Sequence, residues 1–337
     1  GERDCSLQRR NQKLIEESPP VWLSEFGKEE LKKATLMIAK SSNYVNAGTV
    51  EFLADNDENF YFLEMNTRLQ VEHTVTEMRY GIDLVKEQIK IALGNSLEDF
   101  ETEARGHSIE FRINAEDPAN NFLPTPGTIT EYREPMGNGV RVDGWVKTGT
   151  SISHFYDNLI SKLVVWGVSR EEAISKGKRC LDEYIIGGIP TTISLLSQVI
   201  STKEFKESQI HVKFLEENFK ITDISEEETI SDRPSKVNIS LDDNESQSLA
   251  PQRPKKIGMD LTGNIRNPGI IKAEMQGTIM DTMTKKGKKV KKGDSLFVLE
   301  AMKMENVVTA PIGGVIKEFN IKKGQPVNKG DILVEIG

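Results

Sequence analysis

The sequence has little cysteine, no excess of positive charge and no long apolar run. Its 337 residues include two cysteines, Cys5 and Cys180, which cannot build the disulfide framework of a small secreted domain. No apolar stretch approaches the roughly 20 residues that span a bilayer. The formal net charge of -8 disfavours binding to nucleic acid or to an anionic membrane. We therefore expect a soluble, cytoplasmic protein of two or three domains, or a mitochondrial one if the chain is eukaryotic.

The sequence also shows no initiator methionine and no signal or transit peptide. It begins at Gly1 and runs directly into Glu2-Arg3-Asp4-Cys5. We expect further residues upstream of Gly1. Histidine is scarce as well, and its 4 residues are scattered, which disfavours a zinc site.

Residues 220–267 differ in composition from the rest of the chain. They are rich in Ser, Asp and Glu, and residues 224–243 contain no aromatic side chain. Such a segment buries too little apolar surface to offset its ordering entropy, so we predict a flexible linker. A long surface loop is the alternative, but loops of this length are uncommon within compact domains.

Residues 268–337 contain an internal repeat. Lys285-Lys286-Gly287 recurs 37 residues later as Lys322-Lys323-Gly324, and Lys292-Gly293-Asp294 recurs as Lys329-Gly330-Asp331. Short β-branched runs alternate with glycine-containing turns, which predicts an all-β fold. Two copies this short cannot each enclose a core. We expect them to interlock as a flattened barrel of two small sheets with pseudo-twofold symmetry.

The segment Glu300-Ala301-Met302-Lys303-Met304-Glu305 lies between the two copies. An exposed lysine is most often an ordinary surface residue, but two flanking methionines are costly on an exposed turn. The arrangement resembles the biotin carboxyl carrier domain, which implies biotin linked to Lys303 by a biotin protein ligase. Lipoyl carriers share this fold, but they usually have an acidic residue before the lysine and lack the second methionine.

Two strand-like runs, residues 48–53 and 60–66, flank a turn-rich segment and predict a β-hairpin. With the turn centred at 57/58, Glu51 lies opposite Glu64, and Thr49 lies opposite Asn66. The two carboxylates and the amide then share one face of the hairpin. Opposed carboxylates destabilise a hairpin unless a cation lies between them, and Mg²⁺ or Mn²⁺ prefers such oxygen ligands, with phosphate completing the shell.

Polar residues continue at every second position beyond this hairpin, as Glu64, Asn66, Arg68, Gln70 and Glu72. An exposed strand edge is the common meaning of such alternation. A planar guanidinium also suits an oxyanion, and a nearby carboxylate suits a general base.

If the alternation holds, His73 faces the opposite way and has a structural role. Further along the chain, the apolar spacing of residues 170–186 predicts an amphipathic helix.

Several long segments, in order, resemble the biotin carboxylases of the ATP-grasp superfamily: Glu2–Arg10, Glu64–His73, Arg112–Pro118, Phe122–Gly127 and Tyr156–Leu163. The resemblance implies an α+β body followed by the all-β biotinyl barrel. It assigns residues 1–95 to the C-terminal part of an ATP-grasp domain and 96–219 to the biotin carboxylase C-terminal domain. The linker would span 220–267 and the carrier 268–337.

The resemblance also implies roles for particular residues. Glu51, Glu64 and Asn66 would hold the metal at the ATP phosphates, and Gln8 would lie near the nucleotide. Lys13, Arg68, Gln70 and the Val71 backbone would bind bicarbonate. Glu72 would deprotonate bicarbonate for attack on the γ-phosphoryl group, and Arg112 would stabilise the enolate-like biotin.

The resemblance implies the biotin-containing subunit of an acyl-CoA or pyruvate carboxylase, with self-association through the body and a separate carboxyltransferase subunit. The acyl acceptor cannot be read from the sequence. Residues 1–50 contain no glycine-rich phosphate loop, so we expect the chain alone to be inactive. A stand-alone biotin carrier with a vestigial body is the alternative.

Overall fold

The structure, a computed structural model, describes residues 1–96, 103–153, 156–218, 269–273, 276–301 and 304–337. The chain divides into two compact units, Gly1–Ile224 and Ser225–Gly337. The predicted linker and Lys303 lie outside the described residues. No helix in the described part of the chain is long and apolar enough to cross a bilayer.

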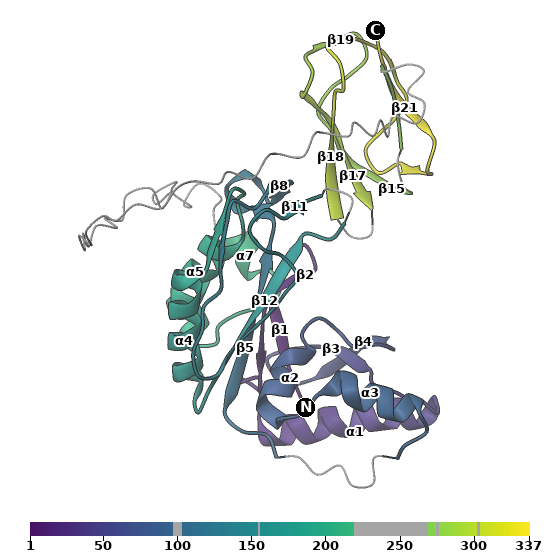
Figure 1. The fold of residues 1–337 in the computed structure, drawn as a ribbon. Helices are drawn as coiled ribbons and strands as arrows, with labels where there is room; N and C mark the ends of the chain where they lie inside the picture. Colours follow the sequence, from purple (N-terminus) through teal and green to yellow (C-terminus); the bar gives the residue numbers. More distant parts are fainter. Residues whose placement is uncertain (97–102, 154–155, 219–268, 274–275, 302–303) are drawn as a thin grey trace, which may run out of the picture. The chain divides into compact units, whose positions relative to one another are not determined.

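An antiparallel five-stranded sheet forms the centre of the first unit, with the strand order β1-β2-β5-β12-β10 (Figure 1). The strands are β1 (Asp4–Arg9), β2 (Gln12–Ser18), β5 (His107–Asn114), β12 (Leu159–Gly167) and β10 (Val140–Gly144). This sheet draws strands from both sides of the domain boundary placed at 95/96. That boundary stays a prediction.

The two faces of this sheet differ because side chains alternate along each strand. On β5, Ile109, Phe111 and Ile113 are buried in the apolar core against α4 (Arg170–Glu183) and α5 (Ile193–Ser201). Glu110 and Arg112 alternate with them and so face the side on which α2 (His73–Tyr80) packs (Figure 1). The sheet therefore has one apolar and one polar face, and the polar face carries the candidate site.

Helix α4 begins as the sequence predicts. The Ser169 hydroxyl caps it by accepting a hydrogen bond from the Glu172 N–H at 3.3 Å. The predicted end at residue 186 is wrong, because Ile185–Gly187 forms strand β13, which pairs with β9 (Glu131–Arg133). Backbone pairing within a sheet ends the helix earlier than its apolar spacing suggests.

Strands β3 (Thr49–Ala54) and β4 (Phe60–Asn66) form the predicted hairpin, with Glu51 opposite Glu64 and Thr49 opposite Asn66. The extension of the alternation beyond this strand is wrong. The strand ends at Asn66, and the Gln70 carbonyl accepts a hydrogen bond from the His73 N–H at 3.3 Å, in the turn that leads into α2. Residues 67–72 therefore do not form one extended row.

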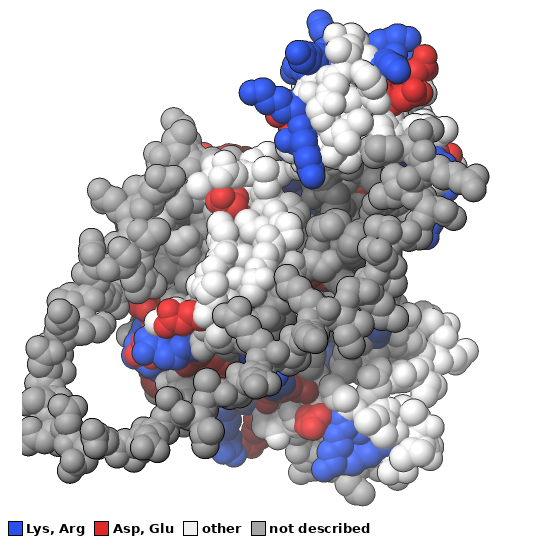
Figure 2. Space-filling view, turned by 45° about the horizontal axis from the view of Figure 1, so that its top comes forward, with Lys and Arg blue, Asp and Glu red and all other residues white. Residues whose placement is uncertain are grey.

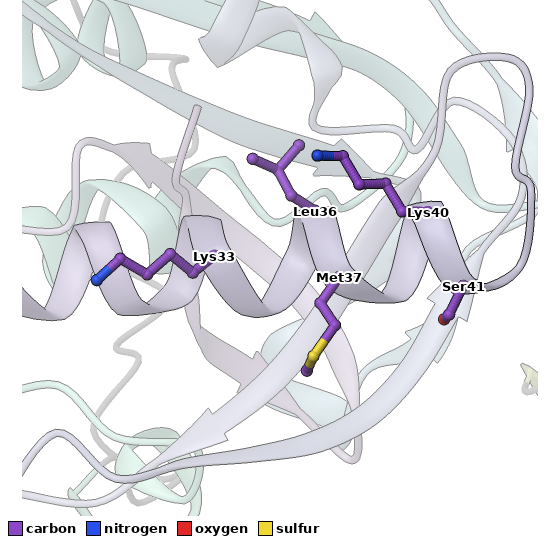
Figure 3. A pocket seen from close by; sticks show the side chains of 5 residues that line it. All are labelled: Lys33, Leu36, Met37, Lys40 and Ser41. Atoms are coloured by element: carbon purple, nitrogen blue, oxygen red, sulfur yellow. The ribbon is translucent and has the colours of Figure 1, made fainter.

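The other elements of this unit are α1 (Glu25–Ser41), α3 (Leu84–Ala92), α6 (Lys203–Lys206), α7 (Phe214–Asn218), a 3-10 helix (Pro118–Asn120), β6 (Glu116–Asp117), β7 (Leu123–Pro124), β8 (Gly127–Thr128) and β11 (Ser151–Ile152). Figure 3 shows a shallow surface on α1, lined by Lys33, Leu36, Met37, Lys40 and Ser41. All five side chains come from one helix, so the surface brings together no groups from separate elements.

Two four-stranded sheets, ordered β14-β21-β19-β16 and β18-β17-β15-β20, form the second unit. Their strands are β14 (Ile270–Lys272), β15 (Gly277–Thr282), β16 (Lys289–Val290), β17 (Ser295–Ala301), β18 (Met304–Thr309), β19 (Gly314–Phe319), β20 (Pro326–Val327) and β21 (Ile332–Ile336). The expected all-β fold of two small sheets is confirmed. Figure 2 shows lysine side chains on the surface of this unit.

The repeat in the sequence is also a repeat in the hydrogen bonds. The Gly293 N–H donates to the Ala310 carbonyl at 2.8 Å, and the Gly330 N–H donates to the Ala273 carbonyl at 2.7 Å. Both alanines are buried in the core of the unit. Equivalent positions in the two halves thus make the same contacts, which gives the unit its internal twofold symmetry.

Strands β17 and β18 pair so that Ala301 lies opposite Met304. Lys303 follows β17 in the sequence and precedes β18 directly, but its own placement is outside the described residues. The strands that enclose the candidate biotinylation site in the sequence are thus partners in one sheet.

Candidate active site

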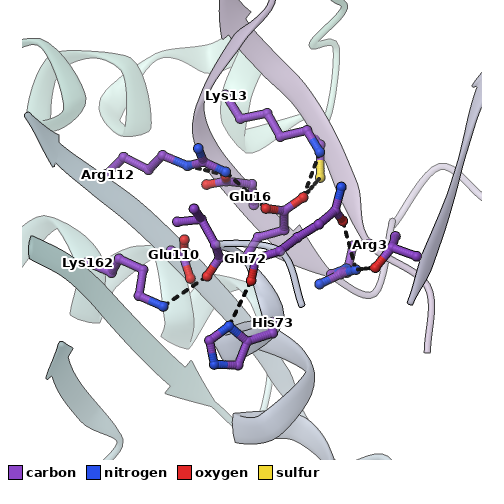
Figure 4. A network of polar contacts seen from close by, with 12 residues as sticks. Arg3, Lys13, Glu16, Glu72, His73, Glu110, Arg112 and Lys162 are labelled. Carbon is purple, nitrogen blue, oxygen red and sulfur yellow. Dashed lines mark hydrogen bonds and ion pairs between the residues drawn. The ribbon is translucent and has the colours of Figure 1, made fainter. Parts of the chain in front are cut away.

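Charged side chains from distant segments meet at the polar face of the large sheet (Figure 4). Glu72, which directly precedes α2, is 2% exposed. Its carboxylate accepts hydrogen bonds from Lys13 Nζ at 2.6 Å and from Arg112 Nη2 at 3.0 Å. Lys13 comes from β2 and Arg112 from β5, so the fold holds one carboxylate between two cations.

This arrangement sets the charge state of Glu72. Burial by itself would raise the pKa of its carboxyl group, but the positive charges of Lys13, Arg3 and Arg112 outweigh burial and lower the pKa to about 2. Burial also opposes the charge on Lys13, but the Glu72 carboxylate raises the pKa of Lys13. Glu72, Lys13 and Arg112 are therefore charged at neutral pH. Glu72 is a weak base while Lys13 and Arg112 both hold it.

Two further carboxyl groups lie beneath Arg112. Glu16 and Glu110 are fully buried and are direct partners across β2 and β5. Arg112 Nε donates to Glu16 at 2.6 Å, and the Thr74 hydroxyl donates to Glu110. Within the described chain, one oxygen of each carboxyl group has no hydrogen-bond partner.

Burial, followed by the negative charge of Glu16, raises the pKa of Glu110 to about 8. Glu110 is therefore mostly protonated at neutral pH. Burial also raises the pKa of Glu16, and the positive charge of Arg112 opposes this shift.

The hairpin residues predicted to hold a metal lie together. Asn66 Nδ2 donates to Glu64 Oε1 at 2.8 Å and to Glu51 Oε1 at 3.1 Å. The same Glu51 oxygen accepts hydrogen bonds from Lys13 Nζ at 3.0 Å and from the Gln70 amide. One amide thus bridges both carboxylates, and Glu51 also connects the hairpin to the Lys13–Glu72 pair.

These residues fit a hard divalent cation. Two carboxylates and one amide could supply three oxygen ligands, and Mg²⁺ commonly completes its shell with phosphate and water. The amide oxygen and nitrogen of Asn66 exchange places by a flip of the side chain. Among the described residues, no three His, Cys, Asp or Glu side chains group to hold a metal ion. The hairpin therefore offers a divalent cation two carboxylates and, after such a flip, one amide oxygen.

The remaining predicted site residues lie in different surroundings. Gln8 is half-buried on β1, directly opposite Lys13. Val71 is half-buried, and its carbonyl accepts a hydrogen bond from Lys162 Nζ at 2.9 Å. Arg68 is exposed, and its guanidinium donates to the Leu69 carbonyl at 3.1 Å. Within the described residues, no hydrogen bond or ion pair joins Arg68 to another predicted ligand.

Sequence reasoning missed Arg3, Glu16, Glu110 and Lys162. Arg3 Nη2 donates to Gln70 Oε1 at 3.2 Å and to Thr49 Oγ1 at 2.7 Å, so it joins the first strand to the hairpin. Alternation along β5 could have placed Glu110 on the same face as Arg112. No local spacing reveals Arg3, because its partners lie at sequence separations of 46 and 67 residues.

Three family models match this chain in succession. Residues 1–100 match the ATP-binding domain of the carbamoyl-phosphate synthase L chain, residues 110–217 match the biotin carboxylase C-terminal domain, and residues 263–336 match the biotin-requiring enzyme domain. The chain therefore carries an ATP-binding domain and a biotin carboxylase C-terminal domain, followed by a biotin/lipoyl domain.

Individual relatives agree with this assignment. The chain is 49% identical over 219 residues to the biotin carboxylase of a Nostoc species, covering 64% of this chain and 49% of that protein. It is 38% identical over 343 residues to the biotin-dependent acyl-coenzyme A carboxylase alpha3 subunit of Mycobacterium leprae, covering 92% of this chain and 57% of that protein. The chain spans about half the length of these curated relatives.

A solved structure shares the fold of the body. The biotin carboxylase domain of Hydrogenobacter thermophilus 2-oxoglutarate carboxylase is 45% identical, with a TM-score of 0.65. The match covers 67% of this chain and 50% of that one. That structure is a dimer in complex with MgADP, ADP and bicarbonate.

Proposed function

We propose that this chain takes part in the ATP- and bicarbonate-dependent carboxylation of biotin carried on Lys303. A separate carboxyltransferase subunit would then transfer the carboxyl group to an acyl-CoA or to pyruvate. The observation that supports this most strongly is the buried Glu72 carboxylate between Lys13 and Arg112. Two fixed cations beside a carboxylate suit the binding of a small oxyanion and the removal of its proton.

The ion pairs suggest how Glu72 becomes a base. Bicarbonate bound to Lys13 would compete with Glu72 for this hydrogen-bond donor, while Arg112 would stabilise the enolate-like biotin. Glu72 then loses part of the stabilisation of its charged form, and its pKa rises from about 2 toward the ordinary value. The carboxylate could accept the bicarbonate proton as a bicarbonate oxygen attacks the γ-phosphorus and ADP leaves. Arg112 stays in place because Glu16 holds its guanidinium from beneath.

The remaining components follow from the same proposal. Glu51, Glu64 and Asn66 would hold a divalent cation, which supplies positive charge at the transferring phosphoryl group. Biotin on Lys303, attached by a biotin protein ligase, accepts the carboxyl group. Because the similar Hydrogenobacter domain is a dimer, we propose self-association through the body. The cytoplasmic location stays a prediction.

A stand-alone carrier with a vestigial body is not favoured. Glu16, Glu72 and Arg112 form a buried network of charges, and removing charges from water costs several kcal/mol per ion before pairing repays it. A body that served only as a support would gain stability from apolar replacements. The retained network therefore supports a chemical role for the body.

A binding measurement on the pure chain tests this function. Titration with ¹³C-labelled bicarbonate, followed by NMR, would compare the wild type with Lys13→Met. Loss of a charge-assisted contact should weaken binding about tenfold. Lys33→Met is the matched control, because Lys33 is 67% exposed on α1, away from the charged site. Equal affinities for bicarbonate in Lys13→Met and the wild type would refute the proposed site.

A further inference from the structure

Two side chains that the proposed chemistry does not use hold the backbone on either side of Val71. His73 Nδ1 lies 2.8 Å from the Gln70 carbonyl oxygen, and Lys162 Nζ donates to the Val71 carbonyl oxygen at 2.9 Å. A carbonyl oxygen only accepts hydrogen bonds, so Nδ1 of His73 must carry the proton. Figure 4 shows Lys162 and His73 each joined by a dashed line to a backbone oxygen.

These contacts fix two successive peptide groups. The Gln70–Val71 and Val71–Glu72 bonds are trans, so each N–H points opposite to its own C=O. Holding the Gln70 carbonyl therefore orients the Val71 N–H. Holding the Val71 carbonyl orients the peptide that leads to the Glu72 Cα, from which the Glu72 side chain departs.

The position of Lys162 calls for such an explanation. Lys162 on β12 lies directly opposite Arg112 on β5, and two opposed cations are unfavourable in a sheet. Lys162 is 9% exposed, and its ion-pair distance to Asp143 is 3.7 Å. The shorter contact of its ammonium group is the Val71 carbonyl. Burying a lysine beside an arginine costs stability, and a role in positioning Val71 and Glu72 accounts for that cost.

The Val71 N–H is available as a donor. Across the described residues, it donates to no other protein group, while the carbonyl of the same peptide accepts two hydrogen bonds from His73. A donor whose direction is fixed and whose partner position is open suits an oxyanion, because little reorganisation is needed on binding.

We propose that Lys162 and His73 are positioning residues that fix the Val71 N–H and the Glu72 side chain for a bound oxyanion. The proposal rests on the proposed function for the identity of that anion, bicarbonate. We call the contact of His73 with the Gln70 carbonyl and that of Lys162 with the Val71 carbonyl the two clamps. Both clamps are features of the chain without any ligand. They can therefore be measured independently of bicarbonate.

The first test uses the pure chain without bicarbonate. Residual dipolar couplings of the Val71 and Glu72 amides report the directions of these two N–H bonds. We expect Lys162→Met to change the Glu72 coupling. Lys176→Met should leave it unchanged, although it removes a similar contact, from a half-buried lysine to the Trp166 carbonyl. Unchanged amide couplings in Lys162→Met would overturn the proposal.

Substitutions of His73 give a second comparison if Lys162→Met does not fold. His73→Leu removes the side-chain donor to the Gln70 carbonyl, whereas the amide of His73→Asn can still donate from a similar position. We expect the Val71 coupling to change in His73→Leu and to be restored in His73→Asn. A simple packing role would not be rescued by asparagine, so equal changes in both variants would contradict the assignment.

A bicarbonate titration of the same samples then links the clamps to the site. We expect the Val71 amide resonance of the wild type to shift, with about tenfold weaker affinity in Lys162→Met and unchanged affinity in Lys176→Met. Equal weakening in both lysine variants would overturn the positioning role. If the wild type does not respond while its amide couplings still depend on Lys162, the proposed function fails and the clamp is supported.

Discussion

Glu72 is the residue on which the charge balance of the site depends. Its folded-state pKa of about 2 lies below the ordinary value of 4.5. Its ion pairs therefore stabilise the fold at neutral pH, and this contribution is lost as the pH falls from 4.5 to 2. The shift corresponds to about 3 kcal/mol. We expect Glu72→Gln to lower the free energy of unfolding at pH 7 by about this amount, and near pH 3 by less than half of it.

Urea denaturation at the two pH values measures this difference. Glu29→Gln serves as the control, because Glu29 is a surface carboxylate, 62% exposed. A difference between wild type and Glu72→Gln that is the same at pH 7 and pH 3 would show that ionic pairing does not stabilise this residue.

The raised pKa of Glu110 predicts that the free energy of unfolding depends on pH in the direction opposite to that for Glu72. Its folded-state pKa is raised from 4.5 to about 8, so between these values the folded chain keeps a proton that the unfolded chain has lost. Stability should therefore fall as the pH rises through this window. Glu110→Gln keeps a neutral side chain of the same shape. We expect its unfolding free energy to lose this pH dependence when denaturation is followed from pH 5 to pH 8.5.

Retention of the full wild-type slope in Glu110→Gln would mean that another group titrates in this range. The groups that face Glu110 are Glu16, Arg112, Lys162 and Thr74. Of these, Glu16 is the other carboxyl group, so Glu16→Gln identifies whether the slope belongs to the pair.

The sequence alone could identify part of this site and no more. Glu51, Glu64 and Asn66 follow from alternation within one short hairpin, where spacing determines geometry. Arg3, Lys162 and Glu16 act through contacts between segments that are distant in the sequence. Such contacts depend on strand order, which local patterns do not encode.

At the scale of elements, the two halves of the carrier unit offer an internal comparison. Gly293 and Gly330 occupy equivalent turns with φ values of 94° and 96°, and a Cβ at either position would meet nothing within 4 Å. Substitution by alanine therefore costs only the strain of a left-handed backbone, about 1 kcal/mol. We expect Gly293→Ala and Gly330→Ala to lower the unfolding free energy of the unit equally, as measured by chemical denaturation.

Unequal losses in these two variants would argue against equivalent roles for the repeats. Gly324→Ala provides a further comparison, because Gly324 also has a positive φ and open space around it.

Elements were easier to predict than their ends. The repeat predicted the paired strands of the carrier, and the apolar spacing predicted α4. Strand β4 ended at Asn66 and α4 ended at Glu183, because turns and sheet pairing interrupt a pattern that continues in the sequence. Propensity and periodicity describe a segment, while its boundary depends on which backbone partner is available.

For the whole molecule, the proposed function joins a charged body to a carrier with its own core. The body holds Glu72 between Lys13 and Arg112, and the carrier contains the paired strands β17 and β18. Tethering a substrate to the chain that processes it raises its effective concentration. The tethered substrate is proposed to be biotin on Lys303.

Peptide mass spectrometry tests this central claim most directly. The chain would be produced with biotin and a biotin protein ligase, digested and compared with Lys303→Arg, with Lys292→Arg as a control in the same unit. We predict one biotin on Lys303 in the wild type and in the control, and none in Lys303→Arg. Lipoate on Lys303, or biotin retained in Lys303→Arg, would contradict the account.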